Sequence, residues 1–541
     1  MIALPGTHGR GNSAIALMPF LARAIGWTLA MLLALPASLQ ASIVRAPAGA
    51  VQGDIHDDVS VFKGLPYALA PIGAARWKPP VPVPAWSGVR QAVEFGAACV
   101  QPKSPPTSIY ADDPAVMSED CLFLNIWTPT DARRAPVLVW IHGGSLRIGS
   151  GSEPLYDGTR LAQHGVVVVS INYRLGVFGY FAHPWLSAES PQRVSGNYGL
   201  LDQIEALRWV KGNIAAFGGD PSNVTVAGES AGALSVLYLM AAPSARGLFA
   251  KAIVQSGSMI STPGLRESES GEQAAEAVGA RFASKLNVTD LTALRAIDAM
   301  TLAELAPKNG YAAFVTIDGH VLPRQLVDVF DAGEQAAVPV LAGFNSGEIR
   351  SLRRLAPPVP ADAAAYEASI RGTYGDLAAK VLELYPANDI EESILAITRD
   401  AVFGWSAERL VRNQTALGQA GFLYFFDHSY TAAEHAGLHG FHAAELPYIF
   451  GTADRAPPSW PKVPATAVET ALSDAMIGYW TAFARSGNPN SKTLPRWSPY
   501  GSTRAYMLFA AAPQAASHLL PGMFELHENV VCRRRPAGSC R

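Results

Sequence analysis

The sequence has few charged side chains and no long apolar segment. Asp, Glu, Lys and Arg make up 16% of the 541 residues, and the formal net charge is −3. A balance so close to neutral gives no indication of a nucleic-acid partner. No segment approaches the roughly eighteen apolar residues that a membrane-spanning helix needs. The chain also lacks internal repeats. Because 49% of its residues are hydrophobic, it is expected to be a well-buried globular protein.

Cysteine is scarce, with four in the chain. Cys99 and Cys121 would close one loop, and Cys532 and Cys540 another, as disulfides do in exported proteins. Neither pair has histidines at metal-binding spacing, so the sequence predicts no zinc site and no other metal.

The N-terminus has the order of an export signal. Basic residues precede an apolar run over residues 24–35, which proline and small residues follow. This order is typical of a signal peptide. We therefore expect residues 1–41 to be a signal, cleaved near Ala37 or Ala41, and the protein to be secreted or periplasmic. An uncleaved anchor is the alternative.

Apolar strands alternate with helices through much of the chain. Residues 43–77 are expected to form an antiparallel opening, and residues 200–216 a helix. Continuous apolar segments, typical of strands buried on both faces, lie at residues 137–141, 166–171, 252–255 and 338–342. The alternation predicts an α/β fold with a mostly parallel sheet covered by helices on both faces. Two helical stretches without a recognisable motif, expected to be insertions, lie at residues 260–330 and 350–415.

The segment from Asn223 to Leu234 has the pattern of a nucleophile elbow. A short β-branched strand leads into Gly228-Glu229-Ser230-Ala231-Gly232, and an apolar helix begins near Ala231. A strand, a sharp glycine-flanked turn and a helix together expose the serine hydroxyl. With 48 glycines in the chain, the pentapeptide alone is also compatible with a turn of small residues.

A serine hydroxyl becomes nucleophilic when a base takes its proton, and the base needs an orienting acid. On this kind of fold the order along the chain is serine, acid, histidine. Glu348 follows the predicted strand at 338–342, and His442 follows another at 422–426. Three further histidines, expected to be solvated loop residues, lie nearby at His428, His435 and His439.

Several motifs occur in a fixed order. They read MSEDCLFLNIW (117–127), WIHGG (140–144), NYRLG (172–176), NYGLLD (197–202), FGGDP (217–221) and GESAG (228–232). With these motifs the chain resembles the type-B carboxylesterase/lipase (cholinesterase-like) family of α/β-hydrolases over about residues 43–515. The resemblance implies an α/β-hydrolase fold with large helical insertions, in a single domain over residues 42–541. It also implies carboxylic-ester hydrolysis without a cofactor.

The resemblance implies a role for specific residues. It makes Ser230 the nucleophile, Glu348 the acid and His442 the general base. It implies an oxyanion hole built from the backbone N–H groups of Gly144, Ser145 and Ala231. Ser145 departs from the glycine or alanine usual in the family, which narrows and polarises the pocket.

Other residues are expected to support the site. The resemblance implies that Cys99 and Cys121 form the family's first disulfide. Glu229, beside the nucleophile, is expected to modulate the electrostatics of the site. Ser256 is expected to contact the catalytic residues without taking part in the reaction itself, with plain packing as the alternative. The buried ion pairs implied by the resemblance are Arg76 with Glu119 and Arg174 with Asp202.

The substrate is constrained only in part. Cholinesterases place a tryptophan where this chain has Ala111, so choline esters are disfavoured. Arg147 lies just past the predicted oxyanion loop, and three arginines follow Glu348, at Arg350, Arg353 and Arg354. They indicate an anionic or strongly polar substrate, with solvated loop charges as the alternative.

Three functions remain in competition. The first is an exported serine esterase that forms an acyl-enzyme with a small-molecule ester. The second is a hydrolase of another acyl bond (amide, carbamate, thioester or lactone) on the same machinery. The third is a non-catalytic binding protein, which the presence of all three triad residues disfavours. Nothing in the sequence indicates an integral membrane span or an oligomeric state.

Overall fold

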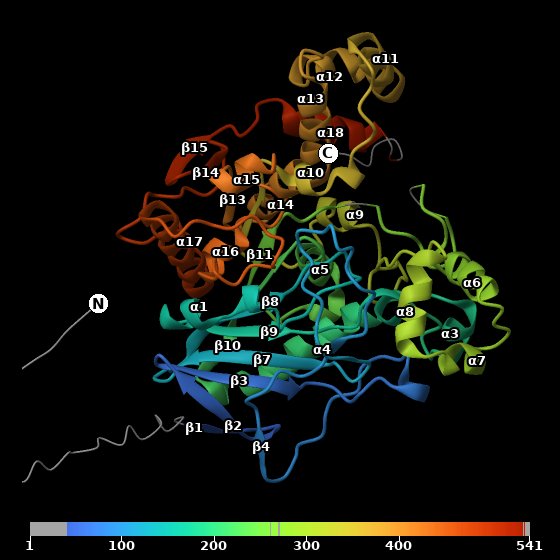
Figure 1. The fold of residues 1–541 in the computed structure, drawn as a ribbon, viewed down its shortest axis with the longest axis vertical. Helices are drawn as coiled ribbons and strands as arrows, with labels where there is room; N and C mark the ends of the chain where they lie inside the picture. The colour runs from blue at the N-terminus through green and yellow to red at the C-terminus, as the bar shows by residue number, and fades with distance from the viewer. Residues whose placement is uncertain (1–40, 260, 269–270, 534, 536–541) are drawn as a thin grey trace, which may run out of the picture. The chain divides into compact units, whose positions relative to one another are not determined.

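A computed structural model of the chain describes residues 41–259, 261–268, 271–533 and 535. Within these ranges a 13-stranded sheet has the order β1-β2-β3-β7-β9-β8-β10-β11-β12-β13-β14-β15, with β4 beside β2. Figure 1 shows the sheet running from the blue N-terminal strands to the red C-terminal ones. The expected signal over residues 1–41 falls almost entirely outside the described residues.

The first three strands form the antiparallel opening that the sequence predicts over residues 43–77. They are β1 (Ala41–Ala46), β2 (Gly49–His56) and β3 (Val59–Pro66); β4 (Val89–Gln91), which is parallel to β2, and β7 (Phe123–Pro129) follow later in the chain. β1, β2, β3 and β7 pair antiparallel in turn, and β7 continues antiparallel onto β9 (Val167–Ile171). Between β4 and β7 the chain forms only two short strands, β5 (Ala98–Cys99) and β6 (Met117–Ser118), which pair with each other.

The middle of the sheet is parallel. From β9 onward the strands are β8 (Ala135–Ile141), β10 (Gly219–Glu229), β11 (Lys251–Gln255), β12 (Val340–Asn345), β13 (Gly421–Phe426) and β14 (Ala505–Phe509), and each neighbouring pair is parallel. β15 (Pro513–Ser517) closes the edge antiparallel to β14. The carboxyl ends of parallel strands share one edge, so the loops after these strands lie close together.

Alternate residues of the central strands enter two different cores. Along β8, Val137, Val139 and Ile141 pack into one apolar core, whereas Leu138 and Trp140 pack into the other. The first core is covered by α4 (Tyr198–Asn213), α5 (Ala231–Ala241) and α14 (Trp405–Ala416), and the second by α1 (Thr159–Gln163), α16 (Leu446–Phe450) and α17 (Ala467–Ser486). Burial on both faces explains why the central strands are continuously apolar.

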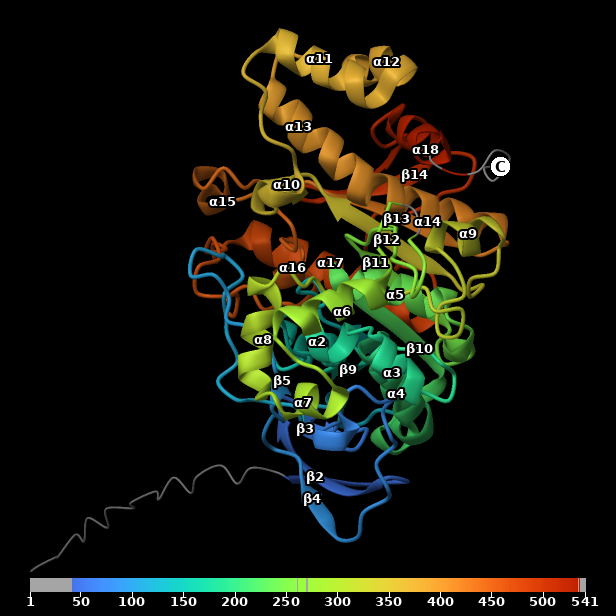
Figure 2. The ribbon, with the colours of Figure 1, turned by 90° about the vertical axis from the view of Figure 1, so that its right-hand side faces the viewer.

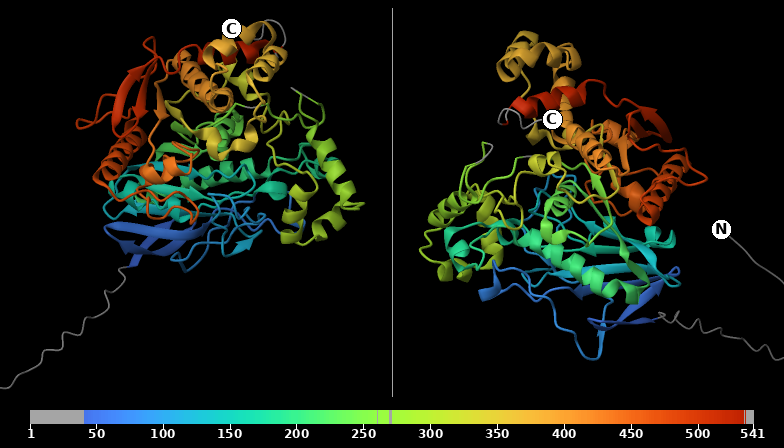
Figure 3. Two further views of the ribbon diagram at one scale, coloured as in Figure 1. Left: turned by 45° about the horizontal axis from the view of Figure 1, so that its top comes forward. Right: turned by 180° about the vertical axis from the view of Figure 1, so that it is seen from behind.

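The remaining helices lie mainly in the insertions. The first set is α2 (Gly176–Tyr180), α3 (Pro184–Glu189), α6 (Ala275–Lys285), α7 (Leu291–Ala296), α8 (Ala299–Lys308) and α9 (Leu326–Asp331). The second is α10 (Glu348–Ser351), α11 (Ala363–Tyr374), α12 (Ala378–Leu384), α13 (Ile390–Arg399), α15 (Thr431–His435) and α18 (Met523–Arg533). Figures 2 and 3 show α11 and α12 beyond α13, at the end away from β4. Both insertions are helical, as the sequence predicts.

Two boundaries differ from the sequence expectation. The helix predicted over 200–216 begins at Tyr198 and ends at Asn213, because a short 3-10 turn follows and Gly218 adopts a left-handed φ of 81°. α17 and the β14–β15 hairpin were not predicted. Within the described ranges, no helix is both long and apolar enough to cross a membrane.

Candidate active site

Ser230 lies where β10 ends and α5 begins. Its backbone has φ 55° and ψ −122°, a conformation that costs a residue with a side chain about 1–3 kcal/mol. The turn is held on both sides. The N–H of Ser230 donates to the carbonyl of Gln255 at 2.9 Å, and its own carbonyl accepts from the N–H of Leu234 at 2.9 Å. This strained strand-to-helix turn is the backbone geometry that the elbow pattern predicts.

The two elbow glycines leave no room for side chains. A Cβ atom on Gly228 would lie 2.5 Å from the carbonyl carbon of Gly232, and one on Gly232 would lie 2.0 Å from the carbonyl oxygen of Ile141. Both separations are far inside van der Waals contact. The close approach of α5 to β8 and β10 therefore requires glycine at both positions.

Glu348 is fully buried at the first position of α10, just past β12. Its Oε1 accepts from the Ser256 hydroxyl at 2.6 Å and from the Asn345 N–H at 2.8 Å. Its Oε2 forms a short hydrogen bond with Nδ1 of His442. Three donors thus fix the carboxylate, and the fixed carboxylate orients the imidazole ring.

His442 lies in the loop between β13 and α16, and its backbone is held in place. The preceding residue, Phe441, pairs with Gly347 in an isolated parallel bridge, which joins this loop to the one that carries Glu348. The hydroxyl of Tyr110 hydrogen-bonds the carbonyl of His442 at 2.9 Å and Oγ of Ser351 at 2.7 Å. Tyr110 lies in the proline-rich loop, where no sequence motif indicates a role beside the site.

The free nitrogen of His442 faces a second carboxylate. Nε2 lies 3.0 Å from Oε1 of Glu229, the residue before Ser230. Among the hydrogen bonds of the described residues, none joins the Ser230 hydroxyl to His442. In substrate-free enzymes such bonds are often long and tighten when substrate binds. The structure therefore brings Glu348 and His442 into direct contact and leaves Ser230 next to them without a hydrogen bond to the imidazole.

Burial and neighbouring charges shift the pKa values of Glu229 and His442 in opposite directions. Burial raises the pKa of Glu229 above its usual value, against the attraction of His442. Burial disfavours the imidazolium of His442, but the carboxylates of Glu229 and Glu348 outweigh it and raise the His442 pKa. Both partners are thus shifted toward holding a proton, and their titrations are coupled because the two groups lie 3.0 Å apart.

A third carboxyl group lies behind the pair. Glu445 is fully buried, and burial raises its pKa. Its oxygens accept from Nε2 of Gln255 at 2.9 Å and from Nδ2 of Asn345 at 2.6 Å. Trp480 of α17 in turn donates to Oε1 of Gln255 at 3.0 Å. This network was not predicted; it ties the loops after β11, β12 and β13 together.

The predicted oxyanion loop follows β8. Gly144 has φ 99° and Ser145 has φ 58°, and the carbonyl of Gly144 accepts from the N–H groups of Arg147 and Ile148 at 3.0 Å. In the described part of the chain, no backbone carbonyl accepts from the N–H of Gly144 or Ser145. A Cβ on Gly143 would lie 3.3 Å from Cβ of Ser230. The loop therefore runs directly beside Ser230 with two unpaired donors.

The third predicted donor, the N–H of Ala231, is at the first position of α5. The first N–H groups of a helix have no acceptor within it. The positive end of the helix dipole lies there as well, which favours a negative charge. Ala231 thus follows Ser230 in the chain, and Gly144 and Ser145 follow Gly143, whose backbone lies close to Ser230.

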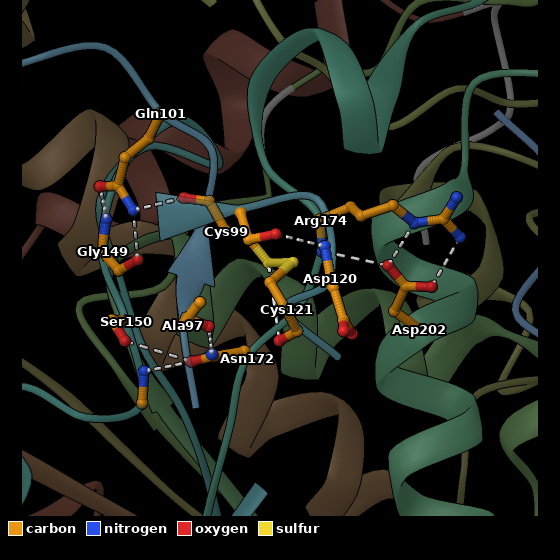
Figure 4. The surroundings of a disulfide bond; sticks show 12 residues. Ala97, Cys99, Gln101, Asp120, Cys121, Gly149, Ser150, Asn172, Arg174 and Asp202 are labelled. Carbon is orange, nitrogen blue, oxygen red and sulfur yellow. Dashed lines mark hydrogen bonds and ion pairs between the residues drawn. A yellow bond between two sulfur atoms is a disulfide. The ribbon is translucent and has the colours of Figure 1, made fainter. Parts of the chain in front are cut away.

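A disulfide joins Cys99 of β5 to Cys121, with an S–S distance of 2.06 Å (Figure 4). Gln101 anchors the same loop: its Nε2 donates to the carbonyl of Gly149 at 2.9 Å, and the N–H of Gly149 donates back at 2.8 Å. Gly149 belongs to the loop that carries Gly144 and Ser145. The closed loop thus contacts the oxyanion loop through Gln101 and the His442 loop through Tyr110.

The predicted second disulfide falls partly outside the described residues, because Cys540 is not among them. Cys532 lies in α18. The two predicted ion pairs are formed: Arg174 contacts Asp202 at 2.7 Å with both side chains buried, and Arg76 contacts Glu119 at 2.6 Å.

One of the competing histidines is not solvated. His428 is buried, and its Nε2 lies 2.8 Å from Oε2 of Glu469 in α17. The expectation for this residue was wrong, because a helix that the sequence did not reveal packs over it. His435 is exposed, and His439 is half-buried with its Nδ1 3.1 Å from Oε2 of Glu434. Within the described residues, no group of three or more His, Cys, Asp or Glu side chains is arranged to hold a metal ion.

Known proteins share this fold and sequence. The chain matches the carboxylesterase family over residues 40–522. It is 36% identical to a fumonisin B1 esterase of Sphingopyxis macrogoltabida, with 91% of each chain covered. It is also 36% identical to a para-nitrobenzyl esterase of Bacillus subtilis, which covers 85% of this chain and 92% of that one.

Solved structures agree. A para-nitrobenzyl (PNB) esterase superimposes with a TM-score of 0.78 at 33% identity, covering 90% of this chain and 99% of the other. A carboxylesterase of Geobacillus stearothermophilus superimposes with a TM-score of 0.76 at 35% identity and the same coverage. The chain therefore belongs to the type-B carboxylesterase family, has the α/β-hydrolase fold and is a carboxylic-ester hydrolase.

Proposed function

We propose that ester hydrolysis proceeds through an acyl-enzyme on Ser230, with His442 as general base and Glu348 as the orienting acid. The observation that carries this proposal is the contact between Glu348 and Nδ1 of His442 beside the strained backbone of Ser230. An acid bound to Nδ1 leaves Nε2 as the nitrogen that exchanges protons.

The proposed reaction has two halves. Oγ of Ser230 attacks the ester carbonyl carbon while His442 Nε2 takes the hydroxyl proton. The carbonyl π electrons move to oxygen, and the backbone N–H groups of Gly144, Ser145 and Ala231 stabilise this oxyanion. Collapse breaks the bond to the alcohol oxygen, which receives the proton from Nε2.

Water then repeats the sequence on the acyl-enzyme. Nε2 takes a proton from the water as its oxygen attacks the acyl carbon. The second tetrahedral intermediate collapses, Ser230 leaves with the proton from Nε2, and the carboxylic acid is released. Glu348 orients the imidazole ring and stabilises the imidazolium that forms twice in each cycle. The Ser256 hydroxyl donates a hydrogen bond to Glu348. The carboxylate of Glu229 raises the pKa of His442.

A panel of 4-nitrophenyl esters, from acetate to long acyl chains, tests the mechanism. Ser230→Ala is expected to abolish turnover, whereas Ser486→Ala, at the exposed end of α17, serves as the matched control. Diethyl 4-nitrophenyl phosphate is expected to add one diethylphosphoryl group to the parent, located on the peptide that contains Ser230. Turnover that survives in a folded Ser230→Ala protein contradicts the proposal.

We also propose that the protein is exported, with residues 1–41 as the cleaved signal and residues 42–541 as one hydrolase domain. The Cys99–Cys121 disulfide supports export, because such bonds persist in oxidising compartments. Expression of the full chain followed by N-terminal sequencing of the mature protein tests this. A new N-terminus after Ala37 or Ala41 is expected, and an intact protein retained in the cytoplasm contradicts it.

A further inference from the structure

Two arginines from different loops meet over the predicted oxyanion loop. Arg147 follows Ser145 by two positions, and Arg354 lies in the 3-10 turn after α10. Nη2 of Arg354 donates to the Ser145 hydroxyl at 3.4 Å. The segment after Glu348 therefore reaches back across the active site to the segment that carries the oxyanion donors.

Neither of these guanidinium groups has a carboxylate partner. Within the described residues, no Asp or Glu oxygen lies within 4.0 Å of Arg147 or Arg354. Their neighbour Arg350 differs, because Glu392 neutralises it at 2.6 Å. Arg353 donates to the carbonyl of Pro357 at 3.0 Å.

Of the two guanidinium groups, that of Arg147 has a buried N–H without a hydrogen-bond acceptor among the described residues. Its Nε is fully buried and makes no hydrogen bond. Burial lowers the pKa of the guanidinium, and the like charge of Arg354 lowers it further. Arg174 and Arg409, which are more deeply buried than the half-buried Arg147, each contact a carboxylate. Two close positive charges without an anion form a site that is electrostatically incomplete.

Arg147 also borders a pocket with mostly apolar walls. The side chains that line it include Val100, Pro102, Leu175, Phe178, Ala306 and Tyr311. Apolar walls lower the local dielectric, which strengthens a guanidinium–carboxylate contact at the edge of the pocket. The pocket itself is small, about 20 Å³, so only a small group, and not a substrate chain, fits beside Arg147.

We propose that this enzyme selects esters that carry a free carboxylate, which Arg147 and Arg354 bind beside the oxyanion loop. The inference rests on the proposed function, because it assigns the substrate class of the Ser230 site. Guanidinium groups suit this role since their N–H groups match the two oxygens of a carboxylate. The carboxylate would supply the counter-charge that the protein itself does not.

Two pairs of esters test the inference; within each pair, a carboxylate in one ester replaces a terminal methyl group in the other. Monomethyl glutarate is compared with methyl pentanoate, which places the carboxylate in the acyl part. The 4-acetoxybutanoate anion is compared with butyl acetate, which places it in the alcohol part. Hydrolysis is followed by pH-stat titration at constant ionic strength. The quantity measured is the ratio of kcat/KM for the charged ester to kcat/KM for its neutral partner.

We expect the charged ester to be preferred in at least one pair. In that pair, Arg147→Gln and Arg354→Gln are each expected to lower the ratio about tenfold, the effect of losing one charge-assisted hydrogen bond. Arg147→Lys should restore part of the ratio. Arg350→Gln is the matched control and should keep it, because that guanidinium is already paired. Added salt should lower the ratio of the parent enzyme.

The outcomes separate the two proposals. If the neutral esters are hydrolysed but the ratio is the same in the parent, Arg147→Gln and Arg354→Gln, the arginines are solvated charges and the substrate class is overturned. If a folded parent hydrolyses none of the four esters, the proposed function fails and the substrate class fails with it. Arg354 is exposed, so its variant reports on the ratio even if Arg147→Gln does not fold.

Discussion

Replacing Glu229 by glutamine should move the activity of this enzyme to lower pH. The carboxylate of Glu229 lies 3.0 Å from Nε2 of His442, where it stabilises the imidazolium. Together with Glu348 it raises the pKa of His442 to about 9. A protonated imidazole cannot accept the proton of Ser230, so a raised pKa moves the rise of kcat/KM toward alkaline pH. Glutamine keeps the size of the side chain and removes the charge.

The size of the shift follows from the geometry. Two full charges 3.0 Å apart interact by ~5 kcal/mol at an effective dielectric constant of about 20. That energy is an upper limit, because burial raises the pKa of Glu229 itself to about 8, so most of the group is neutral near pH 7. One pKa unit corresponds to about 1.4 kcal/mol. Only part of the full interaction therefore acts on His442, and we expect the midpoint of the rising limb of kcat/KM to shift to lower pH by about one unit.

The assay is kcat/KM for 4-nitrophenyl acetate between about pH 5 and 10, with spontaneous hydrolysis subtracted. Absorbance is read at the isosbestic wavelength, so that the ionisation of nitrophenol does not enter. Glu391→Gln, on the exposed side of α13, controls for the loss of a charge elsewhere. A rising limb that stays in place, or moves to higher pH, refutes the assignment of Glu229 as the group that raises the pKa of His442.

Three further substitutions test the support of the site. Ser256→Ala removes a hydrogen bond to the Glu348 carboxylate, so kcat should fall about tenfold with KM little changed; an unaltered kcat would assign Ser256 to packing. Tyr110→Phe removes a hydrogen bond to the His442 backbone, so kcat should fall roughly fivefold. Steady-state kinetics measures kcat and KM for both variants. Arg174→Gln leaves a buried carboxylate without its partner, which should lower the free energy of unfolding by about 3–5 kcal/mol, measured with urea; a loss below about 1 kcal/mol would contradict that estimate.

The parts of the site that sequence reasoning located are those governed by local chemistry. The Gly228 and Gly232 spacing around Ser230, together with the β-branched strand before it and the apolar helix after it, predicts a turn that only glycine permits. Continuous β-branched segments such as the one in β9 mark strands covered on both faces. Glu348 could be anticipated because it follows such a strand.

The parts that were missed depend on contacts between distant segments. Tyr110 supports His442 across 332 positions, and nothing in the surrounding prolines marks it. Glu445 and Gln255 form their hydrogen bond across 190 positions. The sequence predicts a solvated His428, because α17, which buries it, has small residues at many positions and no sharp apolar periodicity. Pairings of this kind follow from topology, which local patterns do not encode.

The order of the strands also has a consequence for biosynthesis. A nascent chain emerges from its N-terminus, so the Ser230 elbow can form against β8 and β11 early. Glu348 and His442 arrive much later, and the strand that precedes His442 lies between β12 and β14 in the sheet. Until β14 is translated, β13 is a bare sheet edge, the kind of surface that invites aggregation. Ribosome-bound fragments that end before β14 should therefore depend on chaperones to avoid aggregation. Fragments that lack His442 should not hydrolyse esters, so esterase activity should appear only when translation is nearly finished.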